Sequence, residues 1–99
     1  MNILNNDKLL KFESGTDITA DLQYYIDNNE DIFLPAGNFI ISSTIKIGSN
    51  KRIIGFGNQN TILRLADHVN TNMFTNADSA LGNNDIRLEN LIIDGNWKN

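Results

Sequence analysis

From Ile32 onward the chain is a series of short apolar runs separated by turn residues, and this pattern limits the fold more than any other feature. The runs occupy residues 32–34, 39–41, 44–47, 52–54, 61–65, 73–74 and 86–93. Glycine, asparagine and proline punctuate them at residues 35–37, 48–50, 55–58 and 94–96. Strands this short, joined by tight corners, suit a sandwich, a barrel or a solenoid of stacked strands.

The last run distinguishes these folds. Ile86 and Leu88 alternate with charged residues, Asn90 breaks the alternation, and Leu91 and Ile93 resume it. Asparagine tolerates a left-handed backbone, so a one-residue corner at Asn90 can join two strands that face the same core. A hairpin would need two turn residues, typically Asn-Gly or Asp-Gly. The pattern therefore favours the corner by which a β-helix coil changes face.

Residues 17–29 carry the one helical pattern in the chain. Its apolar positions follow i, i+4, i+7 and i+8: Ile18, Leu22, Tyr25 and Ile26. We predict Asp17 or Thr19 as the N-cap, because either side chain can accept from a free backbone N–H. A helix of about ten residues is too short to persist alone in water, so its apolar stripe must pack on the strands.

Charge and composition exclude several classes of function. The chain carries 8 Lys and Arg against 12 Asp and Glu, a net charge of −4, which argues against nucleic acid and anionic membrane surfaces as partners. A polyuronate would need a local basic site. No apolar stretch approaches the length of a membrane span, and residues 1–7 do not resemble a signal peptide. There is no cysteine, and we expect no metal and no other cofactor.

In the order of its pieces, the chain resembles the N-terminal region of the pectate-lyase-like superfamily from about residue 17 to residue 96. The helix contributes Ile18, Leu22, Gln23, Ile26 and Asp27, and the strand motifs lie at residues 33–41, 42–47, 49–57, 61–65 and 86–96. Three departures stand out. Residues 12–16 replace a glycine- and aspartate-rich motif, Lys51 stands where an inward apolar residue is usual, and residues 66–85 separate two of the strand motifs.

The resemblance implies a mainly β fold: the N-terminal coils of a right-handed parallel β-helix, with one short capping α-helix near residues 17–29. It also implies that residues 1–99 are a single domain, the cap and first coils of a β-helix. Because such coils bury their core by stacking on one another, we expect either that the natural protein continues or that this piece associates through its uncovered end. Such relatives include phage tailspikes and appendages, bacterial polysaccharide lyases and hydrolases, and mannuronan epimerases.

We therefore expect the capping segment of a polysaccharide-degrading or polysaccharide-modifying protein, located on a virion or secreted. The alternative is a non-catalytic carbohydrate-binding or surface-attachment module. A third reading is an independent small β protein whose resemblance is convergent. Polysaccharide would be bound by downstream coils, and we expect a homo-oligomer, a trimer if the parent is a tailspike.

We assign no catalytic residue and no metal ligand within these 99 residues, and leave any carbohydrate-binding residues unassigned. Asp94 could bind sugar or metal, but its place beside Gly95 favours shaping the turn. Asn90 fits a corner better than a ligand contact. His68 could act with Asp67 and Asn70 as a base or metal site, but neighbours in sequence on a strand face opposite ways, so an exposed loop histidine is favoured.

Two further sets of residues could contact a ligand. The basic residues Lys51, Arg52 and Arg64 could bind an acidic sugar, although a solvated face is the favoured interpretation. The aromatic residues could stack on sugars: Tyr24, Tyr25, Phe33, Phe39, Phe56, Phe74 and Trp97. We expect core or edge packing for all of these except Tyr24 and Trp97, for which both roles stay open.

Overall fold

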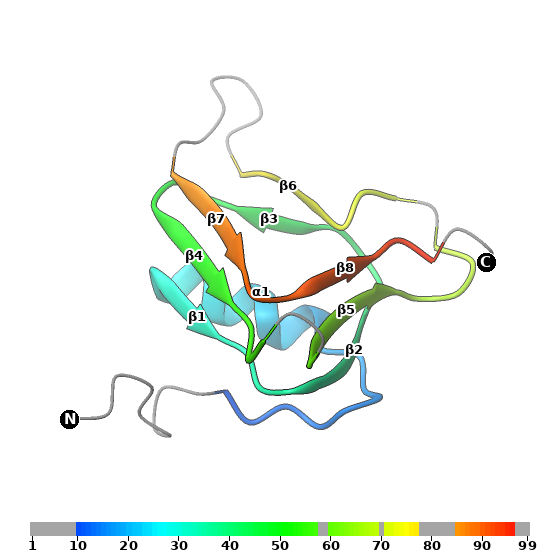
Figure 1. The fold of residues 1–99 in the computed structure, drawn as a ribbon. Helices are drawn as coiled ribbons and strands as arrows, with labels where there is room; N and C mark the ends of the chain where they lie inside the picture. The colour runs from blue at the N-terminus through cyan, green and yellow to red at the C-terminus, as the bar shows by residue number, and fades with distance from the viewer. Residues whose placement is uncertain (1–9, 58–59, 70, 78–84, 97–99) are drawn as a thin grey trace.

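A computed structural model describes residues 10–57, 60–69, 71–77 and 85–96 (Figure 1). One helix is followed by eight strands: α1 (Thr19–Asn28), β1 (Asp31–Phe33), β2 (Gly37–Ile41), β3 (Ile45–Ile47), β4 (Lys51–Ile54), β5 (Thr61–Leu65), β6 (Phe74–Asn76), β7 (Ile86–Glu89) and β8 (Ile92–Asp94). Consecutive strands enter different sheets, and every pairing between strands is parallel. The sheets have the strand orders β1-β4-β7, β2-β5-β8 and β3-β6.

The expectation of a right-handed parallel β-helix is wrong for these residues. The structure is mainly β with one short helix, but its strands form three short parallel sheets and do not make a clear right-handed β-helix. The short apolar runs and tight corners of the sequence predict short strands and the turns between them, but they do not predict a continuous winding. A continuous winding would also require every turn to add a strand to every sheet. Within the described residues the third sheet holds only β3 and β6.

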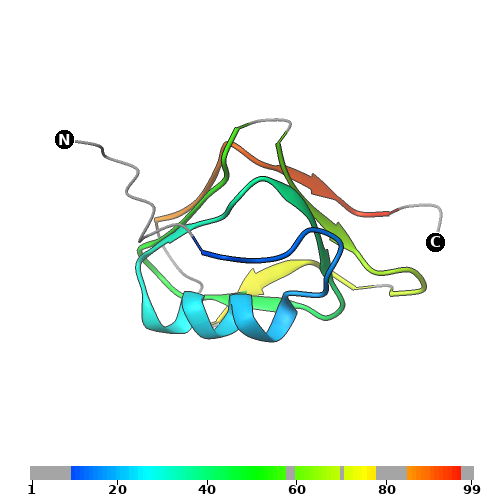
Figure 2. The same cartoon turned by 90° about the horizontal axis from the view of Figure 1, so that it is seen from below.

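The core lies between the three sheets and α1. Alternate side chains of β2, β3 and β5 point inward, as the two-residue period of a strand requires. Ile18, Leu22 and Ile26 supply the buried stripe of the helical region, which confirms the predicted apolar face, while Tyr25 is half-buried. Figure 2, seen from below, shows the sheets around this core, with α1 against β3.

The helix begins one residue later than an Asp17 cap would place it. Ile18 occupies the N-cap position, and Asp17 forms an isolated parallel bridge with Ile40. The Asp17 carboxylate nevertheless accepts from the backbone N–H of Thr19, at 2.9 Å, and from its hydroxyl, at 2.6 Å. Asp17 is not the N-cap because pairing with β2 keeps it in the extended segment. Thr19 is not the N-cap because it is the first residue of the helix.

Asp17 gives the fold an acid-dependent contribution to stability. Burial raises the pKa of its carboxyl. Hydrogen bonds from Ser42 and Thr19 together lower it by more, so the pKa lies below its ordinary value. The stabilisation is therefore complete above the unfolded pKa of about 3.9 and is lost as the pH falls through the folded pKa. We expect the stability difference between the parent chain and Asp17→Asn to shrink as the pH falls below about 4 in urea unfolding. Ser42→Ala should give part of this change, and an identical pH dependence in the parent and Asp17→Asn would contradict the assignment.

One end of the three sheets is covered by the preceding chain. The Leu10 N–H donates to the Phe33 carbonyl beside β1, and the Gly15 and Ile18 N–H groups donate to β2 at distances of 2.6–3.0 Å. At β3 the partner is a side chain: the Gln23 amide donates to the Lys46 carbonyl at 2.9 Å and accepts from its N–H at 2.8 Å. Gln23 thus replaces a neighbouring strand at an edge that would otherwise present unpaired backbone groups.

Replacing Gln23 tests this closure of the β3 edge. Gln23→Leu keeps a good helix former but removes both bonds to Lys46, so we expect a loss of about 1–2 kcal/mol in the free energy of unfolding. Gln23→Glu keeps the acceptor and loses the donor. In a denaturant titration its midpoint should fall between those of the parent chain and Gln23→Leu. A midpoint unchanged by Gln23→Leu would show that the paired geometry contributes nothing to stability.

Among the described residues, the opposite end of the sheets is open. Leu88 and Ile93 pair in register with Ile53 and Leu63, which are fully buried, yet they are 41% and 42% exposed. They face the core from β7 and β8, the strands farthest from α1 in their sheets (Figure 1). The described residues therefore present one closed end and one apolar end.

No described helix is long and apolar enough to span a bilayer.

Candidate functional site

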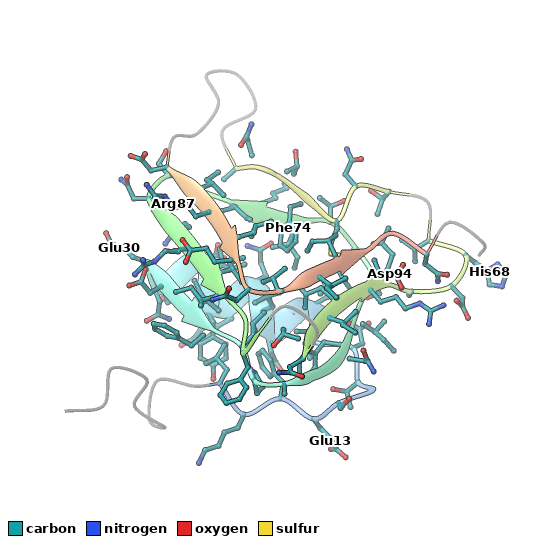
Figure 3. The ribbon with its side chains drawn as sticks, in the orientation of Figure 1. Glu13, Glu30, His68, Phe74, Arg87 and Asp94 are labelled. Atoms are coloured by element: carbon teal, nitrogen blue, oxygen red, sulfur yellow. The ribbon has the colours of Figure 1, made fainter. Side chains whose placement is uncertain are left out.

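Asp94 shapes the turn that follows β8, as predicted. Its Oδ1 accepts from the backbone N–H of Asn96 at 2.9 Å, and its Oδ2 lies 3.8 Å from Nε of Arg64. Figure 3 shows Asp94 on β8, between the strands and the loop that carries His68. Because the carboxylate is engaged with its own turn and with Arg64, the contacts favour a structural role.

Asn96 is the residue of this motif that sequence reasoning did not single out. It has a left-handed backbone, with φ of 54°, and its side chain is buried. Its Nδ2 donates to the Leu65 carbonyl at 3.0 Å and to Asp67 Oδ1 at 2.8 Å, while its Oδ1 accepts from Arg64 at 3.1 Å. We call Arg64, Asp67, Asp94 and Asn96 the Asn96 network.

Removing the Asn96 side chain should cost more than removing an exposed asparagine. Asn96→Ala leaves the Leu65 carbonyl without this partner and gives up the left-handed preference, so we expect a loss of about 1–3 kcal/mol. Asn38→Ala, at an exposed position on β2, is the matched control and should change the free energy of unfolding by less than about 0.5 kcal/mol. Equal losses in the two variants would show that the network contributes little.

The structure confirms the corner and the loop histidine. Asn90 lies between β7 and β8 with φ of 57°, and its carbonyl accepts from the Gly57 N–H at 3.2 Å. His68 is exposed at a left-handed position after β5, while the neighbouring Asp67 points to Asn96. Asn70 lies outside the described residues. Within the part of the chain that the structure describes, no group of three His, Cys, Asp or Glu could hold a metal ion.

The three predicted basic residues do not form one patch. Lys51 donates to the Asn29 carbonyl at 2.8 Å and is half-buried, so its hydrogen bond accounts for a lysine at this position. Arg52 pairs with Asp31 at 3.2 Å, and the hydrogen bond and charge of Asp31 raise the pKa of Arg52. Arg64 lies in a different sheet, in the Asn96 network.

The register also brings an arginine that sequence reasoning missed beside Arg52. Arg87 of β7 is the direct cross-strand partner of Arg52, which in turn is the partner of Asp31. A hollow of about 250 Å³ is lined by Asp31, Asn50, Lys51, Arg52, Asp85 and Arg87. The outward position of Arg87 can be read from the alternation of its strand, but its neighbour across the sheet cannot.

The aromatic residues divide between the core and the surface. Phe39 is fully buried, and Tyr25, Phe33 and Phe74 are half-buried, as packing predicts. The expectation of core or edge packing is not met by Phe56, which is 51% exposed. Tyr24 is 61% exposed, and Trp97 lies outside the described residues.

The hollow that combines aromatic and polar side chains lies where α1 ends and β1 begins. We call it the α1–β1 hollow; its volume is about 590 Å³. It is lined by Leu10, Tyr25, Asn28, Asn29, Glu30, Asp31, Ile32 and Phe33. Figure 3 places Glu30 beside this end of β1. The sequence signal is the pair Tyr24-Tyr25 followed by the polar run 28–31, which the helical pattern alone interprets as a helix end.

Comparison with known proteins identifies the family. The family model described as "Rhamnogalacturonase A/epimerase, pectate lyase-like" matches residues 9–99, so the chain belongs to this pectate-lyase-like family, as the resemblance predicted.

Among individual proteins, the chain is similar to phage appendage proteins. It is 29% identical over 89 residues to the preneck appendage protein of Bacillus phage PZA and to the pre-neck appendage protein of Bacillus phage phi29. It is 32% identical over 86 residues to the pre-neck appendage protein of Bacillus phage B103. Each alignment covers 85% of this chain and 10% of the relative, so the chain spans about a tenth of the length of these proteins. No solved structure matches the chain significantly.

Proposed function

We propose that this chain is a module of a phage virion appendage and serves in attachment to the surface of the host cell. The observation that carries the proposal is the similarity to pre-neck appendage proteins of three Bacillus phages, which covers 85% of the chain. The location that follows is the virion, and the surface that it meets is the polysaccharide-bearing envelope of a bacterium.

The geometry supports a module that ends one side of a larger structure. Leu10, residues 15–18 and Gln23 satisfy backbone groups at the closed end, whereas Leu88 and Ile93 leave apolar surface at the other. In this proposal residues 1–99 are a single N-terminal domain of a longer protein, and further polypeptide of that protein covers Leu88 and Ile93. Leu88 and Ile93 are 41% and 42% exposed, so covering each side chain would contribute less than half of the roughly 1.5–3 kcal/mol of full burial.

A second candidate is that the parent protein degrades or modifies polysaccharide. The description of the matching family, which names a rhamnogalacturonase and an epimerase, favours it. In that case we expect the catalytic groups in other parts of the parent protein, as the family resemblance implies; Asp94 and Asp67 of this chain are held in the Asn96 network. Release of new reducing ends from host-wall polysaccharide by the parent protein, but not by this chain, would support this candidate.

Antibody fragments against the folded chain test the attachment proposal. Monovalent fragments that bind intact phage particles should slow adsorption to host cells, because they cover an appendage surface. A fragment raised against a capsid protein, used at equal occupancy, should leave the adsorption rate unchanged. Fragments that bind the particles but leave adsorption at its normal rate would contradict a role in attachment.

A further inference from the structure

The outer edge of β7 is free at the open end of the sheets. β7 pairs with β4 on one side, and among the described residues no strand pairs with it on the other. On the β4 side the Glu89 carbonyl accepts from the Gly55 N–H at 2.8 Å. Because the backbone groups of successive residues in a strand point to opposite sides, the N–H and C=O of Leu88 point away from β4. The free edge therefore offers a donor and an acceptor at Leu88.

The side chains of β7 give this edge an apolar face and a charged face. Leu88 points toward the core, like its register partner Ile53, and is 41% exposed. Arg87 and Glu89 flank Leu88 in the strand, so their side chains point to the outer face. Figure 3 places Arg87 near the beginning of β7, and no described residue forms an ion pair with it. One positive and one negative charge thus stand on either side of an uncovered leucine.

A second copy related by a two-fold axis is complementary to this edge. Antiparallel pairing centred on Leu88 places the two Leu88 residues opposite each other, as a pair that exchanges both backbone hydrogen bonds. It also places Arg87 of each copy opposite Glu89 of the other, in a pair without backbone bonds, where side chains lie closest. This pairing satisfies the free backbone groups, covers Leu88 and joins two pairs of opposite charges.

Charge favours this register over its neighbours. A shift by one residue would place inward side chains opposite outward ones. A pairing centred on Arg87 or on Glu89 keeps the faces matched, but it places like charges directly opposite each other, which is destabilising. The register centred on Leu88 is the one that suits both faces of β7.

The closed end limits the assembly to two copies. Leu10, residues 15–18 and Gln23 already satisfy backbone groups at that end, so among the described residues the open end is the one that offers free strand edges. An interface in which both copies use the same surface closes as a dimer. We infer that the chain by itself forms a two-fold dimer through its open end, with β7 paired to β7 of the second copy. The inference goes beyond the proposed function, in which further polypeptide of the parent protein covers this end.

Sedimentation equilibrium of the full chain tests the inference. We expect a monomer–dimer equilibrium that depends on concentration, with an upper mass of twice 11.1 kDa. Arg87→Glu places two glutamates opposite each other at both symmetric contacts, and Glu89→Arg does the same with arginines. Each variant should raise the dissociation constant of the dimer by about tenfold or more. Mixed in equal amounts, the two variants regain opposite charges at both contacts and should form a one-to-one heterodimer.

Glu13→Arg is the matched control, because it changes the net charge by the same amount as Glu89→Arg. Glu13 is exposed, Figure 3 shows it away from Arg87, and its variant should leave the dissociation constant unchanged. Recovery of association on mixing also shows that both charge variants are folded. The inference is overturned by a monomer at every concentration, by an assembly larger than a dimer, by a dimer that neither charge variant weakens, or by charge variants that do not associate when mixed.

Discussion

Leu22→Asp unfolds the chain at neutral pH, whereas Tyr24→Asp, two residues along the same helix, leaves it folded. Leu22 is fully buried between α1 and the sheets, and Tyr24 is 61% exposed. The first change removes roughly 1.5–3 kcal/mol of apolar burial and also buries an unpaired carboxylate, which costs more. Together these approach the whole stability of a small domain, about 5 kcal/mol at the low end.

Circular dichroism and thermal melting of the two variants check this expectation. Ile26→Asp, at the other fully buried position of α1, should behave like Leu22→Asp. Helical signal and a cooperative melt retained in both buried variants would mean that α1 does not close the core. Loss of folding in Tyr24→Asp as well would point to helix propensity instead of burial as the cause.

Gly55→Ala destabilises the chain by about 1–3 kcal/mol, while Gly48→Ala does not. A Cβ at position 55 would lie 2.8 Å from Cβ of Leu91 and 2.9 Å from Cβ of Thr61, and it would also collide with the carbonyl of Asn90. Thr61 cannot move away freely, because its buried hydroxyl donates to the Pro35 carbonyl and accepts from the Phe56 N–H, each at 2.8 Å.

Gly48 is the matched control for that substitution. Apart from residues 47–49 themselves, no atom lies within 4 Å of a Cβ built there. Chemical unfolding of both variants separates steric crowding from the general cost of replacing a glycine. If Gly48→Ala and Gly55→Ala lower the free energy of unfolding equally, the corner at Asn90 does not press on Gly55 as the structure has it.

Features set by local periodicity were predictable from the sequence. Ile18, Leu22 and Ile26 repeat at helical spacing, and Asn90 interrupts a strand alternation at one residue, so both the helix face and the corner follow from neighbours in the chain. The β-helix expectation failed at a different level. Regular winding depends on how many strands each sheet collects, and the third sheet has only two among the described residues.

The candidate sites were harder to predict, because their partners are distant in sequence. Asn96 is hydrogen-bonded to Arg64, Leu65 and Asp67, which precede it by 29 to 32 positions in the chain. Arg52 meets Arg87 only through the register of β4 and β7. The α1–β1 hollow likewise joins the end of a helix to a strand and to Leu10. Chain spacing does not encode these approaches. The less favoured interpretation of Lys51, Arg52 and Arg64, a basic patch, does not hold because the structure divides them between two sheets.

The most direct test of the central claim, that the chain is part of a virion appendage, is immunogold electron microscopy of purified phage particles with antibodies against the folded chain. Gold is expected on the appendages, and it should be lost when the antibodies are first absorbed with the chain. Gold confined to the capsid or tail shaft, or strong antigen in infected-cell lysate with none on the particles, would contradict it.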